Sequence, residues 1–205
     1  MECRRLAPAP GKSPLAIIEP MRLLPLAAGV ALLLSLQSTH ADVRACACDV
    51  TRPETLEVRE CSLCKAAEAQ PPEPAYFALK DVNPNKPHRW LALPRYHGPN
   101  PQHFTDMTAA QREAYWSFTI AKARELWPAG DWALAVNSLQ RRTQCHAHIH
   151  IGKLREGVES ATFTVVDGPA AIPVPREGDG LWVHPAGNQL HVHTGDEAPE
   201  LLLER

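Results

Sequence analysis

The sequence has little net charge and no apolar run that is comfortably long enough to span a membrane. The formal net charge is −2 over 205 residues, so the composition predicts no bulk attraction to nucleic acid or to an anionic membrane. The apolar stretch from Leu23 to Leu36 is shorter than the roughly 20 residues that a membrane-spanning helix needs. Because the chain contains 20 prolines, we expect few long uninterrupted helices. No internal repeat is visible.

The remaining composition is that of a folded globular protein. The chain is 44% hydrophobic and 21% charged, which is ordinary for a soluble domain and excludes general disorder. Its length fits one domain with a substantial core.

Residues 1–41 are expected to precede the folded domain. From Met21, a basic residue is followed by the apolar stretch and then by the small-residue boundary Ser38–Ala41, which is the layout of a secretory signal peptide. We predict that translation begins at Met21, that cleavage follows Ala41, and that the mature protein is exported to the periplasm. The alternative is that the segment is retained as an N-terminal membrane anchor.

Hydrophobic periodicity predicts short strands and one strong helix. The helix is expected over Thr108–Trp127, because Thr108 and Gln111 have capping-box spacing and Pro128 and Gly130 end the pattern. A shorter helical turn is expected near Ser62–Gln70. Strands are expected at residues 76–79, 90–93, 132–137, 145–151, 162–166, 181–184 and 190–192. This order predicts an α+β fold with an antiparallel sheet.

Three histidines alternate along one expected strand, in the run His146-Ala147-His148-Ile149-His150. Alternate residues of a strand share a face, so the histidines would lie on one side while Ala147 and Ile149 face the core. Neighbouring histidines would be about 7 Å apart and the outer two about 13 Å apart. A single metal ion with bonds near 2 Å cannot bind all three. The spacing therefore favours a row of imidazoles lining a site, where neutral imidazole is a nucleophile and its neighbours exchange protons.

This run resembles the signature of the histidine-triad superfamily, His-x-His-x-His followed by apolar residues, and the resemblance covers about residues 60–153. The family also carries an apolar strand, Asp-x-x-Pro, His, a second apolar strand and Pro-x-x-His. The matching positions here are Tyr76–Asp81, Asn83-Pro84, His88, Trp90–Pro94 and His97. The resemblance implies a HIT-like fold, in which one main helix packs on the antiparallel sheet.

Within the superfamily, residues 137–151 are most similar to bacterial CDP-diacylglycerol pyrophosphatases, which carry a similar Arg-Thr-Gln-x-His-x-His-x-His run. Arg142 stands where nucleotide-binding members usually have Gln, so their substrate contacts cannot be carried over intact. Little resemblance continues after Gly157, so the C-terminal third could set a different substrate. The expected organisation is residues 1–41 as the N-terminus with its signal, 42–60 as a lead-in, 61–155 as the HIT-like core, and 156–205 as a strand-rich extension of the same domain.

The resemblance implies a phosphoanhydride hydrolase that acts on a nucleotide-linked substrate such as CDP-diacylglycerol. His148 would attack the phosphorus in line and form a phosphohistidine, which water then hydrolyses; no cofactor is required for this catalysis. His146 and His150 would orient His148 or hydrogen-bond the phosphoryl oxygens. His88 would lie beside them, although a turn-facing surface position is the alternative for it. The expected substrate-binding residues are Asn137, where the family places a nucleotide-contacting Asn, together with Arg142 and Thr143.

The cysteines leave three alternatives open. Cys61-x-x-Cys64 has the spacing of a metal knuckle, and the resemblance implies a structural zinc site formed by Cys61, Cys64, His97 and His146. Export instead favours a disulfide that involves Cys61 or Cys64, and the third alternative is unbonded thiols. Cys46-x-Cys48 alone is too weak a pattern to interpret. After cleavage at Ala41 five cysteines remain, so at least one thiol is expected to lie outside intramolecular disulfides.

Two other functions compete with hydrolysis. A second His-x-His pair, His191 and His193, together with His184, is compatible with a metal-binding protein without catalysis, although Asp and Glu are not interleaved with these histidines. A nucleotide-binding domain without turnover is the third reading. The expected partner is a small nucleotide or a CDP-lipid at a membrane surface, without nucleic acid. A homodimer is left open.

Overall fold

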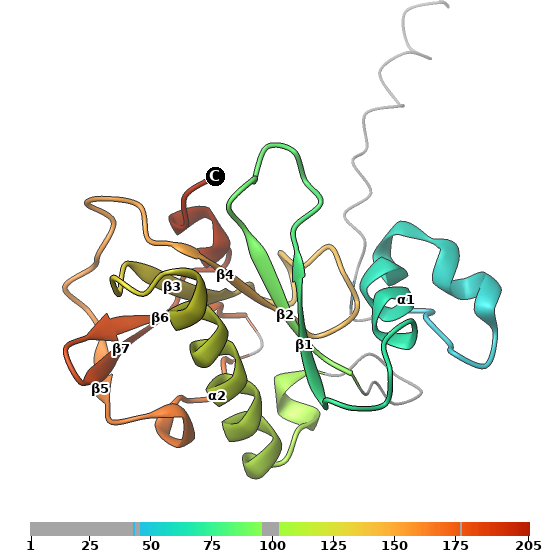
Figure 1. The fold of residues 1–205 in the computed structure, drawn as a ribbon, viewed down its shortest axis with the longest axis horizontal. Coiled ribbons are helices and arrows are strands. Elements are labelled where there is room, and N and C mark those ends of the chain that lie inside the picture. The colour runs from blue at the N-terminus through green and yellow to red at the C-terminus, as the bar shows by residue number, and fades with distance from the viewer. Residues whose placement is uncertain (1–42, 44–45, 96–102, 177) are drawn as a thin grey trace, which may run out of the picture. The chain divides into compact units, whose positions relative to one another are not determined.

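The computed structural model describes residues 43, 46–95, 103–176 and 178–205, and it contains a seven-stranded antiparallel sheet (Figure 1). The strands are β1 (Tyr76–Lys80), β2 (Trp90–Pro94), β3 (Trp132–Val136), β4 (Ile149–Lys153), β5 (Thr164–Val166), β6 (Leu181–Ala186) and β7 (Gln189–Thr194). Their order across the sheet is β1-β2-β4-β3-β6-β7-β5. The fold is therefore α+β, as the sequence predicts.

The helices are few and mostly short. They are α1 (Ser62–Glu68), α2 (Ala109–Leu126) and the 3-10 turns η2 (Pro53–Glu57), η3 (Arg59–Cys61), η4 (Phe104–Asp106), η5 (Pro169–Ala171) and η6 (Pro199–Leu202). None of the helices in the described residues is both long and apolar enough to cross a membrane. The expected signal peptide and His97 lie outside the described residues.

Helix α2 begins where the capping box predicts. The Thr108 side chain accepts a hydrogen bond from the backbone N–H of Gln111 at 3.2 Å, and the Gln111 side chain accepts one from the backbone N–H of Thr108 at 2.8 Å. The helix ends at Leu126, just before Pro128, which cannot continue it. Its ends therefore differ from the expected ones by a single residue each.

The main core lies between α2 and one face of the sheet, which α2 crosses in Figure 1. Tyr115, Trp116 and Ile120 of α2 pack against Leu134 of β3 and Ile151 of β4, and all five are buried. Each such side chain contributes about 1.5–3 kcal/mol by leaving water. The Tyr115 hydroxyl donates to the Ala92 carbonyl at 2.6 Å, which ties the helix to β2 without leaving a buried polar group unsatisfied.

The opposite face of the sheet is covered partly by the C-terminal segment. Arg89, which is buried, lies across this face and donates hydrogen bonds to the backbone carbonyls of Glu200, Leu203 and Glu204 at 2.6–2.7 Å. Gly152 makes room for it, because a Cβ at that position would lie 3.0 Å from the Arg89 side chain. The segment around η6 is therefore held against the sheet by this buried guanidinium group, together with backbone hydrogen bonds from Arg155 to Leu202 and from Glu204 to Lys153.

One disulfide connects the segment of residues 46–61 to the rest of the domain, and a second closes a loop within that segment. Cys46 is bonded to Cys145, and Cys48 is bonded to Cys61. Cys145 directly precedes the histidine run, and its backbone N–H also donates to the Glu60 carbonyl at 2.8 Å. Of the three alternatives left open for Cys61 and Cys64, the structure has a disulfide at Cys61, and Cys46 and Cys48, which the sequence leaves uninterpreted, supply two of the four bonded sulfurs.

Candidate functional site

The histidine run enters the sheet at β4, which is a central strand. Its neighbours are β2 and β3, and His150 pairs with Leu91 on one side and Ala135 on the other. The run is strand only from Ile149 onward. Residues 145–148 belong instead to an irregular lead-in, which is fixed at Cys145 by the disulfide and by the bond to Glu60. Ala147, Ile149 and Ile151 pack into the core under α2, so alternation directs His148 and His150 to the opposite face.

His148 is held in one tautomer. Its Nδ1 lies 2.8 Å from the backbone carbonyl of His146, and because a carbonyl only accepts, Nδ1 must carry the proton. Nε2 is then the nitrogen with the lone pair. The side chain is only 6% exposed, and burial, with smaller effects from His150 and Arg142, lowers the pKa of His148 well below its ordinary value. His148 is therefore a neutral imidazole whose basic nitrogen is available to a ligand.

His150 lies edge-on to His148 and beside a carboxylate. The two ring centroids are 4.9 Å apart at an interplanar angle of 81°, and Nε2 of His150 is 3.4 Å from an Oε of Glu200. Burial lowers the pKa of His150 to about 4, although Glu200 opposes the shift. Burial would raise the pKa of Glu200, but His150 and Lys86 outweigh it and hold this pKa at about 2. At neutral pH the His150 imidazole is therefore neutral and the Glu200 carboxylate is ionised.

Lys86 and Glu200 complete this arrangement, and sequence analysis missed both. Lys86 Nζ is 2.8 Å from Glu200 Oε2, and both side chains are largely buried. The Asn137 side chain accepts a hydrogen bond from the Glu200 backbone at 3.2 Å. Positions 86 and 200 are 114 residues apart in the chain, and neither is part of a local motif. Lys86 could have been suspected because it lies between the family-like segments Asn83-Pro84 and Trp90–Pro94, but nothing in the sequence indicates Glu200.

These groups line a pocket of about 520 Å³. The lining residues are Arg59, Ser62, Leu63, Asp81, Val82, Asn83, Lys86, Leu91, Asn137, Thr143, Gln144, His148, His150 and Glu200. Four of the expected site residues, Asn137, Thr143, His148 and His150, therefore meet in one cavity. The walls come from the β1–β2 loop, the end of β3, the lead-in to β4, α1 and η6.

His146 has a different position from the one expected. It is fully buried, does not line the pocket, and its Nε2 lies 2.8 Å from the carbonyl of Pro94. This nitrogen must donate, so the ring ties the lead-in to β2. His146 contacts His148 through its backbone carbonyl. Of its two expected roles, orienting His148 is therefore compatible with the structure, through the backbone, whereas a side-chain contact with phosphoryl oxygens in the pocket is not.

Arg142 and His88 are also not brought to the pocket. Arg142 is buried, its guanidinium donates to the Cys145 carbonyl at 2.7 Å, and burial lowers its pKa to about 10. It lines a neighbouring hollow of about 220 Å³ with Phe104 and Leu139, which shares Asn137 with the pocket. His88 is exposed in the turn between β1 and β2, so the surface position is the one of its two expected positions that the structure has, and a place beside the other histidines on a strand is not.

The zinc set implied by the resemblance is not assembled. The Cys61 sulfur is bonded to Cys48 and cannot act as a thiolate ligand. Cys64 lies outside both disulfides and within hydrogen-bond reach of the His146 backbone, and burial raises its pKa to about 11. His97 lies outside the described residues. Cys46, Cys48 and Cys145 also cluster closely enough to suggest metal binding, but their sulfurs are in the two disulfides.

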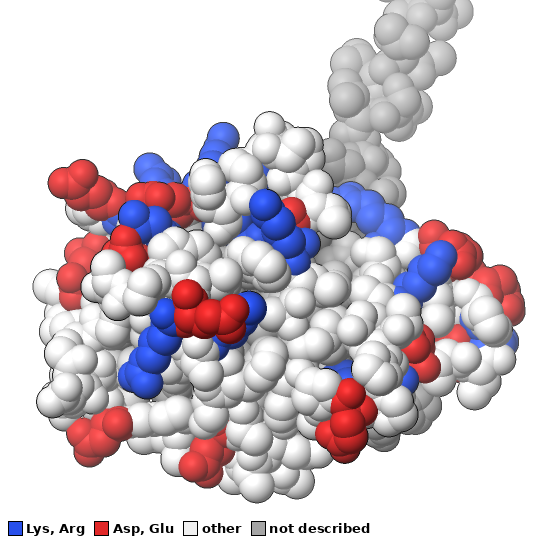
Figure 2. Space-filling view, viewed as in Figure 1, with Lys and Arg blue, Asp and Glu red and all other residues white. Residues whose placement is uncertain are grey.

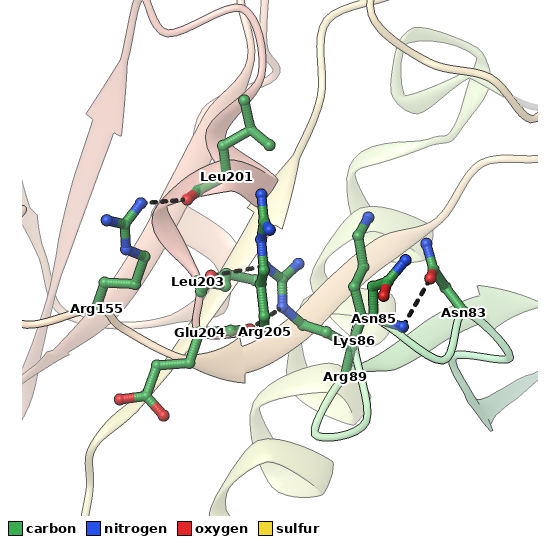
Figure 3. A pocket seen from close by; sticks show the side chains of 9 residues that line it. All are labelled: Asn83, Asn85, Lys86, Arg89, Arg155, Leu201, Leu203, Glu204 and Arg205. Carbon is green, nitrogen blue, oxygen red and sulfur yellow. Dashed lines mark hydrogen bonds between the residues drawn. The ribbon is translucent and has the colours of Figure 1, made fainter.

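A different hollow, of about 860 Å³, is shown in Figure 3. It is lined by Asn83, Asn85, Lys86, Arg89, Arg155, Leu201, Leu203, Glu204 and Arg205. The lining of this hollow is cationic, but its guanidinium groups are already hydrogen-bonded: Arg89 donates to carbonyls of the C-terminal segment, and Arg155 donates to the Leu201 carbonyl at 3.3 Å. These groups therefore hold the C-terminal segment. The pocket of about 520 Å³ around His148 and His150, the triad pocket, is the better candidate for chemistry.

The face of the molecule drawn in Figure 2 carries charged side chains of both signs. On this face, Lys and Arg side chains are interspersed with Asp and Glu side chains.

In comparisons with known proteins, no family model and no curated protein matches this chain.

Proposed function

We propose that this protein is a phosphoanhydride hydrolase of the histidine-triad type, with His148 as its nucleophile. The observation that supports this most directly is the state of His148: a buried, neutral imidazole whose Nδ1 is fixed on a backbone carbonyl and whose Nε2 is left for the pocket. A nucleophile of this kind needs no activating base, because its lone pair is already present at neutral pH.

The reaction has two steps. In the first, Nε2 attacks the phosphorus in line, an N–P bond forms, and the anhydride P–O bond breaks as the leaving phosphate departs with the electron pair. The positive charge that develops on the ring is stabilised through Nδ1–H and the His146 carbonyl. In the second, water attacks the phosphohistidine, the N–P bond breaks, and the electron pair returns to Nε2 while the proton from water passes to solvent.

The pocket also supplies groups for the phosphoryl oxygens. The Lys86 ammonium and the Thr143 hydroxyl are donors that line it, and negative charge develops on those oxygens in the transition state. Glu200 holds Lys86 on one side and faces His150 on the other, so it positions both. The neighbouring hollow with Phe104, Leu139 and Arg142 would take one of the two groups that the anhydride joins, with Asn137 at the junction.

The proposed substrate is a nucleotide-linked anhydride such as CDP-diacylglycerol, and the proposed fold family is HIT-like. The fold family rests on the resemblance over about residues 60–153, and the substrate rests on the resemblance of residues 137–151. Two disulfides are compatible with an oxidising compartment, and we propose the periplasm, reached through the segment at residues 21–41, with retention of that segment as an anchor as the alternative.

The test is hydrolysis by the purified full-length protein of a panel containing CDP-diacylglycerol, ADP-ribose and a nucleotidyl amide. The expected result is turnover of at least one of them and acid-labile phosphoryl label on the native enzyme but not on His148→Ala. Binding without turnover in the native protein would instead favour a nucleotide-binding domain.

A further inference from the structure

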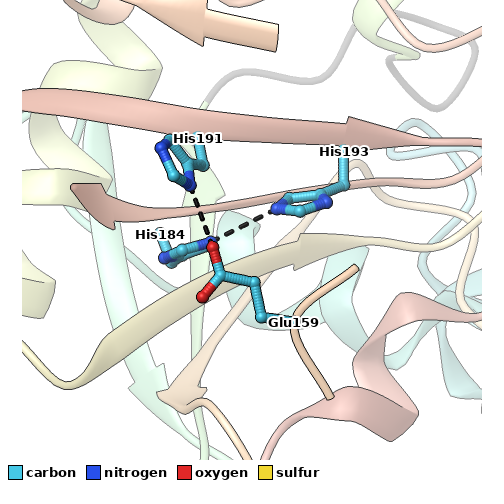
Figure 4. A group of neighbouring side chains, drawn as sticks. All are labelled: Glu159, His184, His191 and His193. Carbon is cyan, nitrogen blue, oxygen red and sulfur yellow. Dashed lines mark hydrogen bonds and ion pairs between the residues drawn. The ribbon is translucent and has the colours of Figure 1, made fainter. Parts of the chain in front are cut away.

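A second group of histidines converges on the same face of the sheet, away from the triad pocket. His184 on β6 pairs directly with His191 on β7, and His193 lies two residues farther along β7. Glu159, from the segment between β4 and β5, reaches the three imidazoles from outside the sheet (Figure 4). Strand β3 lies between β6 and the triad strand β4, so the two groups are at least two strand spacings, about 10 Å, apart.

The ligand atoms are spaced as a tetrahedral metal site requires. His191 Nδ1 is 3.0 Å and His184 Nε2 is 3.4 Å from Glu159 Oε1, while the Nε2 atoms of His184 and His193 are 3.2 Å apart. One ligand atom from each of the four residues lies within 4.8 Å of all the others. In a tetrahedron with bonds of about 2.0 Å, ligand atoms are roughly 3.3 Å apart.

The tautomers of two of these histidines leave an unfavourable contact unless a cation lies between them. His184 Nδ1 faces the Pro185 carbonyl at 3.2 Å, and His193 Nδ1 faces the Thr162 carbonyl at 3.1 Å. Because carbonyls only accept, each Nδ1 carries the proton and each neutral ring has its lone pair on Nε2. The two lone pairs face each other at 3.2 Å. A backbone carbonyl on the second nitrogen is also the usual support of a metal-binding histidine.

Aromatic side chains hold the rings in place. The Trp182 ring stacks on His193 with centroids 3.6 Å apart and planes within 6°, and Phe163 stacks on His191 at 3.8 Å and 13°. Trp182 is itself fixed by a hydrogen bond from its indole N–H to Asp196 at 3.0 Å. The imidazoles are therefore preorganised, which reduces the entropy lost when a ligand binds.

We propose that Glu159, His184, His191 and His193 bind one divalent transition metal ion, and that Zn²⁺ fits the site best. Three imidazoles and one carboxylate, without a thiolate, suit a borderline ion such as zinc better than Mg²⁺ or Ca²⁺. Four protein ligands fill a tetrahedral shell, so the ion closes a structural site that joins the 159–162 segment to the β6–β7 hairpin. Catalysis by His148 does not involve this ion.

The experiment measures Zn²⁺ binding by calorimetry on full-length protein stripped with a chelator. We expect one equivalent of Zn²⁺, no comparable binding of Mg²⁺, and, with Co²⁺ as a probe, the intense visible absorption of tetrahedral coordination. Glu159→Gln and His191→Asn are the informative variants, because the Glu159 side chain is 50% exposed and neither change opens the core. Each should weaken Zn²⁺ binding by more than about 100-fold, beyond the loss expected for a mere supporting contact.

The matched control is His148→Ala, which should bind Zn²⁺ as the native protein does. Loss of Zn²⁺ binding in this control would show that His148 is itself a zinc ligand, and this would overturn the proposal. The proposal would also be overturned by absence of binding in the native protein, by equal binding in both ligand variants, or by a proton shared between His184 and His193 that persists with Zn²⁺ present. Hydrolysis is measured separately, so failure here leaves the triad proposal standing, and the reverse is also true.

Discussion

The histidine pair at the triad pocket and the second histidine group contain ring pairs of similar geometry, but their ring nitrogens face different surroundings. His148 and His150 are edge-on at 4.9 Å, and His184 and His191 are edge-on at 5.1 Å, both at 81°. The first pair comes from β4 and the irregular lead-in just before it, and one nitrogen of His148 is left for a cavity. The second group is drawn from two paired strands, and its nitrogens face one another and a carboxylate. Histidines that alternate along one stretch of the chain thus line a surface, whereas histidines that meet across a strand pair can surround an ion.

The largest expected effect separates the two groups by chemistry. His148→Ala should lower turnover by about three orders of magnitude or more, because nothing replaces a covalent nucleophile. The fold should change little, since the side chain lines a cavity and does not pack in the core under α2. Turnover and far-ultraviolet circular dichroism measure the two quantities. Activity in the native protein that disappears with chelator and returns with zinc would contradict the separation.

Reduction should affect the triad side more than the second group. The Cys46–Cys145 bond joins residues 99 positions apart and ends beside His146. The second histidine group lies after position 145, and no cysteine follows that position. Cys46→Ser should therefore lower the free energy of unfolding by about 2–5 kcal/mol, as measured by urea denaturation. The Zn²⁺ affinity of the folded variant should stay at the native value. If Zn²⁺ affinity fell together with the free energy of unfolding, the pocket around His148 and the second histidine group would not be independent.

The pH dependence of stability should carry the signature of His150. Its pKa falls from 6.5 to about 4 on folding, so the unfolded chain binds more protons between these values and stability declines as pH falls from about 6.5 to 4. Glu200, with a pKa of about 2 against 4.5, adds a further decline below about pH 4.5. In His150→Asn the curve of unfolding free energy against pH should be flatter between pH 6.5 and 4. A variant curve parallel to the native one would contradict the proposed charge state.

The smallest effect is expected at the exposed histidine. His88→Ala should change turnover by less than about twofold, because this side chain is solvent-exposed in the β1–β2 turn and does not line the pocket. It serves as the matched histidine-to-alanine control for His148. A large loss would mean that the turn closes over the substrate and that the sequence-based role of His88 was correct.

Much of the fold follows from local signals in the sequence. The limits of α2 were predictable because the Thr108–Gln111 capping box and Pro128 act within a few residues. Strands β3 and β7 were predictable because their apolar patterns are short and bounded. The disulfide partners were not, since Cys46 and Cys145 are 99 residues apart and only the folded chain brings them together.

The candidate sites were predictable only in part for the same reason. The histidines of both groups are visible in the sequence, as are Asn137 and Thr143. The carboxylates are not: Glu159 is isolated in a loop, and Glu200 reaches His150 only through the η6 turn. The position of His146 depends on a carbonyl of β2, and no pattern of side chains indicates a backbone partner.

Through its hydrogen bonds, Arg89 links the pocket to the docking of the C-terminal segment on the sheet. Its three carbonyl partners are at positions 200, 203 and 204, and the same turn carries the carboxylate that faces His150. The charge pattern beside His148 therefore depends on the docking of η6 on the sheet. A change that loosens the Arg89 hydrogen bonds would also withdraw the Glu200 carboxylate from His150, although Arg89 contacts neither imidazole.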